Sequence, residues 1–209
     1  MSLLGACGSS TSSSSDATSA DTTPVTASDA TTTTVAASTT TTAAATSVAL
    51  FDFANAESAV GWTTQNDTVM GGVSQSTQAW ANGQLVFEGT LSLENNGGFT
   101  SLVSPIDNEL GQRAVGASAI VIDALGDAKT YVLQLRGADN TRFIQRFATV
   151  AGSQQKYELP IDKFEAVTSF LAPVPNAAPL QLANIQQIAL YLLDKQAGPF
   201  RLAVTSISR

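Results

Sequence analysis

The stretch ASAIVIDALGDAKTYVLQLRGADNTRFIQRFAT (117–149) repeatedly places apolar residues at every second position and interrupts them with Gly, Asp and Asn. Its clearest segment contains Tyr131, Leu133 and Leu135, which a β-strand would direct to one face. The tripeptide Ala138-Asp139-Asn140 contains residues that suit a turn, so the next strand should return antiparallel to the first. The stretch therefore predicts an antiparallel sheet with one buried face.

The same pattern continues on both sides of this stretch, and helical periodicity is nearly absent. We expect an all-β, two-sheet jelly-roll sandwich. Two further hairpins are expected, one across the turn 95–98 and one across 195–199. The segment 161–184 contains three prolines and is expected to be an irregular loop with one helical turn. The expected strands are 48–53, 84–93, 98–103, 117–125, 131–135, 141–149, 155–159, 188–192 and 200–204.

Composition divides the chain into three parts. Residues 8–47 contain 24 Ser or Thr and 9 Ala among 40 residues, with no aromatic and no basic residue. Such a segment buries too little apolar surface to offset its chain entropy, so we expect a disordered tether. All nine Phe, both Trp and all ten basic residues lie within 48–209, which is the expected β-sandwich domain. Residues 1–7 form the third part.

The chain has no histidine, one cysteine and a net charge of −7. Without an imidazole it cannot build a Ser-His-Asp or Cys-His nucleophile pair or a His-containing metal site, and one thiol forms no intrachain disulfide. The acidic balance argues against nucleic acid as a partner, because phosphate binding depends on basic patches. The acids show no glycosidase signature, so we expect no enzymatic activity, no metal and no cofactor.

Residues 1–7 end in Leu4-Gly5-Ala6-Cys7, which resembles the lipobox of bacterial lipoproteins. The resemblance implies a lipid on Cys7, a location in the bacterial cell envelope, and membrane contact only through that lipid. Because Met1 to Leu4 is too short for a secretory signal, we expect either that the gene begins upstream of Met1 or that the signal has been removed from this sequence. The alternative is an ordinary cysteine in a disordered terminus.

Two segments carry a family resemblance, Trp62-Thr-Thr-Gln-Asn-Asp-Thr-Val-Met-Gly-Gly-Val-Ser74 and Leu91-Ser-Leu-Glu-Asn-Asn-Gly-Gly-Phe-Thr-Ser101. With Phe87-Glu-Gly and Asp194-Lys-Gln-Ala-Gly-Pro-Phe200, they resemble the complex I intermediate-associated protein 30 family over essentially all of 48–209. The resemblance implies a galactose-binding-like jelly roll, similar in shape to carbohydrate-binding modules. It also implies an assembly or chaperone-like role, as in the mitochondrial members that act on respiratory complex I.

The two motifs contain four polar turn residues, Asn66, Asp67, Asn95 and Asn96. We expect such residues chiefly to hold turns through hydrogen bonds to backbone amides. Gly71 and Gly72 would let the chain turn sharply beside them. The alternative is one polar cluster that offers oxygens to a sugar hydroxyl or to a hard cation such as calcium.

A second candidate set lies on the strands around 131–149 and consists of Gln134, Arg136, Arg142, Gln145 and Arg146. These residues either line a polar groove on one sheet face or form a solvated face, with arginines paired to Asp139 or Glu158. Trp80 is expected in an exposed turn, where its ring would stack on a sugar, whereas Trp62 is expected in the core.

The leading hypothesis is therefore a non-catalytic, lipid-anchored domain that binds a protein partner in an assembly or chaperone-like role. The alternative is a carbohydrate-binding module on a stalk, with an oligosaccharide as its ligand. The two hypotheses differ in the expected surface. A sugar module should expose aromatic rings beside polar turns, whereas a partner-binding domain should expose an apolar patch with a polar rim.

Overall fold

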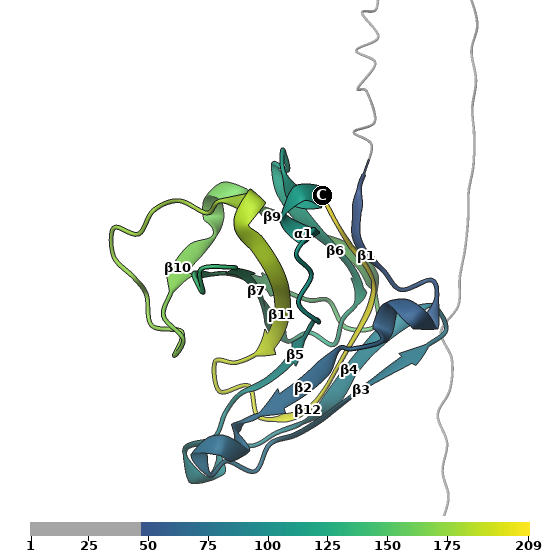
Figure 1. Cartoon of the computed structure of the whole chain (residues 1–209). Helices are drawn as coiled ribbons and strands as arrows, with labels where there is room; N and C mark the ends of the chain where they lie inside the picture. Colours follow the sequence, from purple (N-terminus) through teal and green to yellow (C-terminus); the bar gives the residue numbers. More distant parts are fainter. Residues whose placement is uncertain (1–46) are drawn as a thin grey trace, which may run out of the picture. The chain divides into compact units, whose positions relative to one another are not determined.

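The stretch 117–149 folds as three strands, β6 (Ala119–Leu125), β7 (Thr130–Gly137) and β8 (Arg142–Ala148). β7 and β8 pair antiparallel across the predicted turn 138–140. β6 belongs to a second sheet, so the link between β6 and β7 crosses from one layer to the other. This arrangement is part of a two-sheet antiparallel sandwich in residues 47–209, which are the residues that the computed structural model describes (Figure 1).

The first layer, here called the β12 sheet, has the strand order β3-β4-β12-β6-β9, and β1 also pairs with β12. The second layer, the β7 sheet, has the order β10-β8-β7-β11-β5-β2. The all-β, two-sheet jelly-roll prediction is confirmed. The remaining strands are β1 (Ala49–Asp52), β2 (Thr63–Asn66), β3 (Gln75–Ala81), β4 (Gln84–Leu91), β5 (Thr100–Val103), β9 (Gln154–Pro160), β10 (Glu165–Val167), β11 (Ile185–Leu192) and β12 (Gly198–Ser208).

The main hydrophobic core lies between the two sheets and is built from alternate strand residues. Tyr131, Leu133 and Leu135 of β7 face it and are almost completely buried, as their spacing predicts. Leu85 and Phe87 of β4 meet them from the β12 sheet and are fully buried. Burying one such side chain contributes roughly 1.5–3 kcal/mol, so these alternating residues hold the layers together.

The two further hairpins predicted from turn composition are wrong. β4 and β5 flank the turn 95–98 but belong to different sheets, and the same is true of β11 and β12 around 195–199. Residues that permit a positive φ allow the chain to reverse, and they equally allow it to cross between layers. The residues of a turn therefore predict where a strand ends, but they do not predict which strand it pairs with.

Three strands were missed because their sequences are polar or short. β2 and β3 lie where only a connection was expected, and β10 lies inside the proline-containing segment 161–184. β3 returns to β4 through Asn82 and Gly83, whose φ angles of 52° and 76° permit a tight hairpin. The loop that follows β10 projects from the β7 sheet (Figure 1).

The N-terminal and C-terminal residues of the sandwich domain are hydrogen-bonded to each other. Backbone groups of Val48 and Arg209 exchange two hydrogen bonds of 3.2 and 3.0 Å, next to the pairing of β1 with β12. Cys7 and the predicted tether lie outside the described residues. Within 47–209, no helix has the length and apolar character needed to cross a membrane; α1 spans only Leu110–Ala114.

Candidate functional site

Asp67 joins the two sequence motifs from a fully buried position. Its Oδ1 accepts a hydrogen bond from the Ser74 amide at 3.0 Å, and its Oδ2 accepts from the Ser74 hydroxyl at 2.6 Å and the Gly98 amide at 2.7 Å. Burial raises the pKa of this carboxyl, but these bonds and a longer one from Phe99 more than offset that effect, so the pKa lies below its usual value. Both carboxylate oxygens are therefore engaged within the protein.

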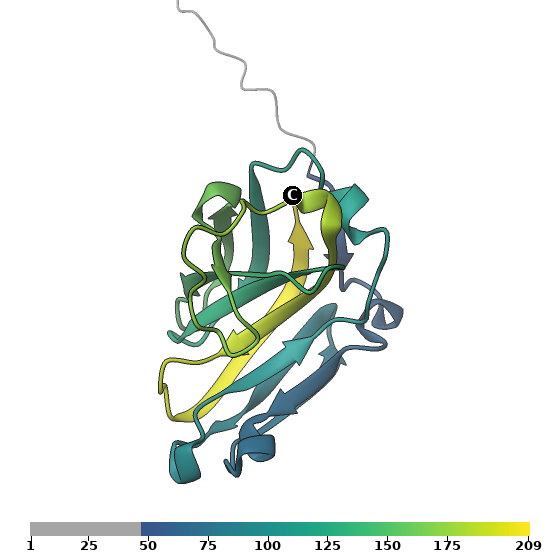
Figure 2. The ribbon, with the colours of Figure 1, turned by 60° about the vertical axis from the view of Figure 1, so that its left-hand side comes forward.

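The bonds to Asp67 place the 3-10 turns at Asp67–Met70 and Glu94–Asn96 next to each other at one end of the sandwich (Figure 2). Asn66 also points inward, because its Oδ1 accepts from the hydroxyls of Ser76 at 2.6 Å and Thr100 at 2.7 Å. Asn95 and Asn96 are exposed instead and adopt φ angles of 54° and 60°. The four motif residues therefore do not form one cluster.

The cation alternative finds no support in the described part of the chain. Within 47–209, no group of three or more Cys, Asp or Glu side chains is arranged to hold a metal ion. Asp67, the one carboxylate of the motif set, is surrounded by protein donors rather than by other oxygen ligands.

Trp80 lies in strand β3 rather than in a turn, which corrects the expected position. Its side chain is 40% exposed, and its indole Nε1 donates a 2.8 Å hydrogen bond to the Phe53 carbonyl. Trp62 is buried as expected and packs edge-on against Phe51 and Phe53, with ring centroids 5.1 and 5.5 Å away. Neither indole contributes to a pocket with the polar residues of the second candidate set.

Alternate residues of β8, β7 and β11 point away from the core and form the outer face of the β7 sheet. Cross-strand pairing places Arg142 opposite Arg136, and Arg136 opposite Gln187. Gln145 pairs with Leu133, whose side chain faces the core, so Gln145 lies on the opposite face from the arginines. The expected groove therefore forms without Gln145. The reason is the period of two, which separates neighbouring residues of one strand onto two faces.

A pocket of about 240 Å³ opens on this outer face. Three side-chain amides, two guanidinium groups and one phenol supply most of its polar groups, and none of its lining residues is acidic. We call it the polar hollow. Its lining residues are Gln65, Val103, Gln134, Arg136, Arg142, Ser169, Gln187, Ile188, Ala189 and Tyr191.

The two arginines of the polar hollow are held by neutral groups. Arg136 Nε donates to Asn140 Oδ1 at 2.9 Å and its Nη1 donates to Gln187 Oε1 at 3.1 Å, while Arg142 Nη1 donates to the Asn140 carbonyl at 3.0 Å. Among residues 47–209, neither guanidinium has a carboxylate within 4.0 Å. The expected pairing with Asp139 or Glu158 is therefore not observed.

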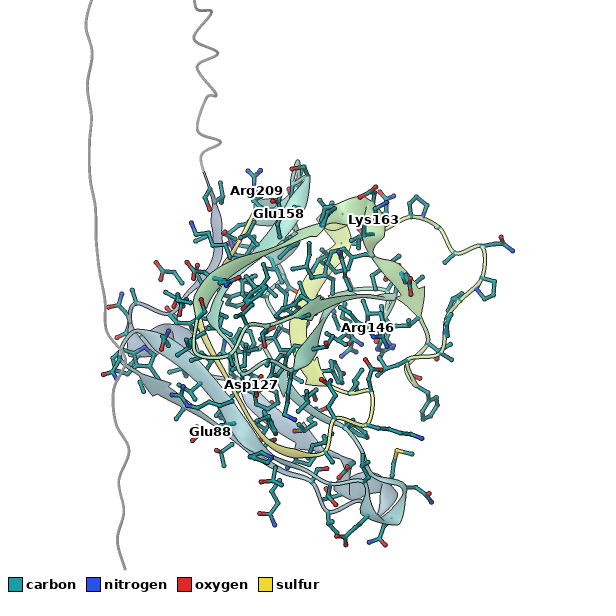
Figure 3. The ribbon with its side chains drawn as sticks, turned by 180° about the vertical axis from the view of Figure 1, so that it is seen from behind. Glu88, Asp127, Arg146, Glu158, Lys163 and Arg209 are labelled. Carbon is teal, nitrogen blue, oxygen red and sulfur yellow. The ribbon has the colours of Figure 1, made fainter. Side chains whose placement is uncertain are left out.

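Arg146 lies four residues beyond Arg142 on β8 and provides a contrast. Its Nε donates to Asp194 Oδ2 at 2.8 Å and its Nη2 donates to Asp194 Oδ1 at 3.0 Å, so the two side chains form a bidentate ion pair. Figure 3 labels Arg146 on the β7 sheet and Glu88 on the β12 sheet, where Glu88 pairs with Arg201 at 3.1 Å. Arg146 and Arg201, one on each sheet, thus have acidic partners of a kind that Arg136 and Arg142 lack among residues 47–209.

Gln134 is the most deeply placed polar side chain of the hollow, at 4% exposure. Its amide Nε2 is buried and has no hydrogen-bond partner in the described part of the chain. Tyr191 lies close by. Burial raises the pKa of the Tyr191 phenol, and the charges of Arg142 and Arg136 and the polar groups of Ser101 and Gln134 lower it by smaller amounts. The hollow therefore combines a neutral phenol and the buried amide of Gln134 with two cations.

Among the glutamines and the tyrosine of the polar hollow, Gln65, Gln187 and Tyr191 were not predicted from the sequence. They come from β2 and β11, whose position beside β7 depends on pairing between distant segments. One signal was present in the sequence. Gln187 and Tyr191 interrupt the alternation of Ile188, Leu190 and Leu192, so they had to face away from the core.

Comparisons with known proteins give a family and a fold. The sequence model described as Complex I intermediate-associated protein 30 (CIA30) matches residues 51–204. No curated protein matches the sequence significantly. A family 11 carbohydrate-binding module from Clostridium thermocellum, solved with a β-1,3-1,4-mixed-linked tetrasaccharide, is 14% identical, with a TM-score of 0.56 over 78% of this chain and 94% of that one.

Two other solved structures show the same likeness. The family 11 module of the cellulosomal cellulase Lic26A-Cel5E of Clostridium thermocellum has a TM-score of 0.55 at 14% identity, over 78% of this chain and 92% of its own. The agarase AgWH50C has a TM-score of 0.53 at 13% identity, and the match covers 78% of this chain but 24% of the agarase. At such low identity the likeness concerns the fold alone.

Proposed function

Because the chain belongs to the complex I intermediate-associated protein 30 family, we propose that it is a non-catalytic binding domain whose ligand is an oligosaccharide held in the polar hollow. Solved carbohydrate-binding modules have a similar sandwich fold. The observation that carries this proposal is the buried Nε2 of Gln134, which has no hydrogen-bond partner among residues 47–209. An unpaired buried donor costs roughly 1–3 kcal/mol. A ligand hydroxyl would supply the missing acceptor.

The chemistry of the polar hollow favours a sugar over a protein surface. Protein interfaces bury an apolar centre that is depleted of charge, whereas this pocket is lined mainly by amides, guanidinium groups and a phenol. Amide groups both donate and accept hydrogen bonds, which suits hydroxyls that do the same. The volume of about 240 Å³ lies just below the range of roughly 300–1,000 Å³ for drug-sized ligands, so it suits one sugar ring of a longer chain.

The test is Gln134→Met in the full chain, because Met keeps the size of Gln and removes its polar groups. We expect the free energy of unfolding to stay the same or rise by up to about 1 kcal/mol, since the unpaired donor disappears. We expect binding to weaken at least tenfold for any oligosaccharide that binds the wild type. Urea unfolding and isothermal titration with mixed-linkage β-glucan, xylan and galacturonan oligosaccharides measure the two quantities.

Gln155→Met is the matched control, because Gln155 is exposed on β9 of the other sheet. This variant should bind as the wild type does. If no oligosaccharide binds the wild type, or if Gln134→Met binds as tightly as the wild type, an oligosaccharide in this pocket is the wrong assignment.

A protein partner is the second candidate, as the family description suggests an association with assembly intermediates of complex I. Its supporting observation is the exposure of three apolar side chains near the motif turns, Met70, Val73 and Leu93, at 61%, 44% and 41%. An assembly or chaperone-like role would use this end of the sandwich. Crosslinking from position 70 in the native host should then capture one specific protein, and capture of none would contradict this candidate.

We also propose that a lipid on Cys7 anchors the domain in the bacterial cell envelope. The support is the lipobox-like sequence at 4–7 followed by a Ser/Thr/Ala-rich stretch. Mass spectrometry of the protein from its host is expected to find an acylated Cys7 at the mature N-terminus, and an unmodified Cys7 would contradict it.

A further inference from the structure

Two arginines of the polar hollow stand directly opposite each other without an acid between them. Arg136 on β7 pairs in register with Arg142 on β8, which brings two positive charges together across the strands. Like charges in this position are unfavourable for a sheet. Both guanidinium groups share Asn140, a neutral residue, as their acceptor. The free protein therefore holds an uncompensated positive pair.

Arg136 and Arg142 form no ion pair with any acid among residues 47–209. Residues 48–209 contain 14 acidic and 10 basic residues, so acids are in excess. Each of the four ion pairs in the described residues joins other groups. Asp139, near in sequence to both arginines, is occupied by the amide and hydroxyl of Thr141 at 3.1 and 2.7 Å. The positive charge of the hollow is thus not neutralised by any carboxylate of residues 47–209.

Arg136 also has N–H donors that are not used within residues 47–209. Arg136 uses its Nε and Nη1 on Asn140 and Gln187, and its Nη2 has no acceptor among residues 47–209. A guanidinium carries five N–H donors in a plane, an arrangement that matches the two oxygens of a carboxylate. Gln187 fixes Arg136 in turn, because its own Nε2 donates to the Ser104 carbonyl at 2.8 Å.

We propose that the polar hollow recognises a saccharide that carries a carboxylate, with the acid group at Arg136 and Arg142. This inference rests on the proposed oligosaccharide-binding function and names its ligand class. The sugar hydroxyls would lie against the amides of Gln134 and Gln65 and the Tyr191 phenol, which line the same pocket. A uronic acid unit within a polysaccharide combines both kinds of group.

The experiment compares an oligomer of α-1,4-linked galacturonic acid with its fully methyl-esterified form, using isothermal titration on the full chain. The two probes share their ring and linkage and differ in charge. The acid form should bind at least about tenfold more tightly than the ester, because a charge-assisted hydrogen bond is worth more than a neutral one. Its affinity should also fall as sodium chloride is raised, because salt screens the charges.

Arg142→Gln removes one charge of the pair and keeps a polar side chain. It should weaken binding of the acid oligomer about ten- to a hundredfold, weaken binding of the ester by a clearly smaller factor, and leave the melting temperature of the free protein equal or raised. Arg201→Gln is the control, because it changes net charge equally on the other sheet. It should bind both probes as the wild type does.

The two proposals fail in different ways. If the ester binds as tightly as the acid, or if Arg142→Gln binds the acid as the wild type does, the carboxylate is not recognised here and the oligosaccharide function stands. If neutral oligosaccharides bind and the acid oligomer does not, the same conclusion holds. If no saccharide binds the wild type, both proposals are overturned.

Discussion

Replacement of Asp67 by alanine is expected to lower the free energy of unfolding by about 3–5 kcal/mol. The substitution leaves the buried amides of Ser74 and Gly98 and the Ser74 hydroxyl without the oxygens that now accept from them. It also releases the two motif turns from each other. Urea unfolding of the full chain, followed by the fluorescence of its tryptophans, measures the change.

Asp67→Asn separates charge from shape. The amide keeps one oxygen but presents N–H groups toward donors, so we expect a loss of at least about 2 kcal/mol. Asp162→Asn is the matched control, because Asp162 is exposed and its pairing with Lys163 at 3.4 Å contributes little. Most surface substitutions change the free energy of unfolding by less than about 0.5 kcal/mol. A loss no larger than that for Asp67→Asn would show that the carboxylate is not needed for the turns.

The pH dependence of stability follows from the lowered pKa of Asp67. A carboxyl whose pKa is lower in the folded state stabilises the protein fully above its unfolded pKa, about 3.9. That contribution is lost as the pH falls through the folded pKa. The stability difference between the wild type and Asp67→Asn should therefore be constant at neutral pH and become smaller below about pH 4.

Gly72→Ala should destabilise the domain by about 3 kcal/mol, whereas Gly71→Ala should cost only about 1 kcal/mol. Gly71 has a φ of 86° and open space around it, so an alanine there meets only backbone strain. A Cβ on Gly72 would overlap the Asp67 carboxyl group, which is fixed by its own hydrogen bonds. The two adjacent glycines are thus required for different reasons.

Thermal and urea unfolding of the two alanine variants tests this ordering. The double variant Gly72→Ala with Asp67→Ala gives a further check, because its loss should be smaller than the sum of the single losses. If Gly71→Ala is the more harmful substitution, backbone conformation rather than contact with Asp67 explains the Gly-Gly pair.

The strands could be predicted from the sequence where apolar residues alternate with polar ones and one face of the strand is buried. β4, β6, β7, β8 and β11 have one apolar face each, and the core residues of β7 follow directly from their spacing. β2 and β3 were not readable, because their residues are mostly polar and gain their strand conformation from pairing with β5 and β4. Strand pairing depends on contacts between residues that are distant in sequence. The residues of a local turn therefore do not predict which strands pair.

The candidate site was readable in part for the same reason. Arg136 and Arg142 share a face because a hairpin joins their strands, and that hairpin is local. Gln187 and Tyr191 reach the same pocket only through the pairing of β11 with β7. The buried carboxylate of Asp67 was expected to hold a turn, but its bond to Gly98, 31 residues away, required the folded chain.

The hydrogen-bonded meeting of Val48 and Arg209 has a consequence for how the domain is carried by longer proteins. Since the first and last strands lie side by side in one sheet, the domain enters and leaves a host chain at nearly the same point. Such a unit fits into a surface loop of another protein without separating the flanking segments. The sandwich is therefore suited to insertion within another chain as well as to attachment at one end of it.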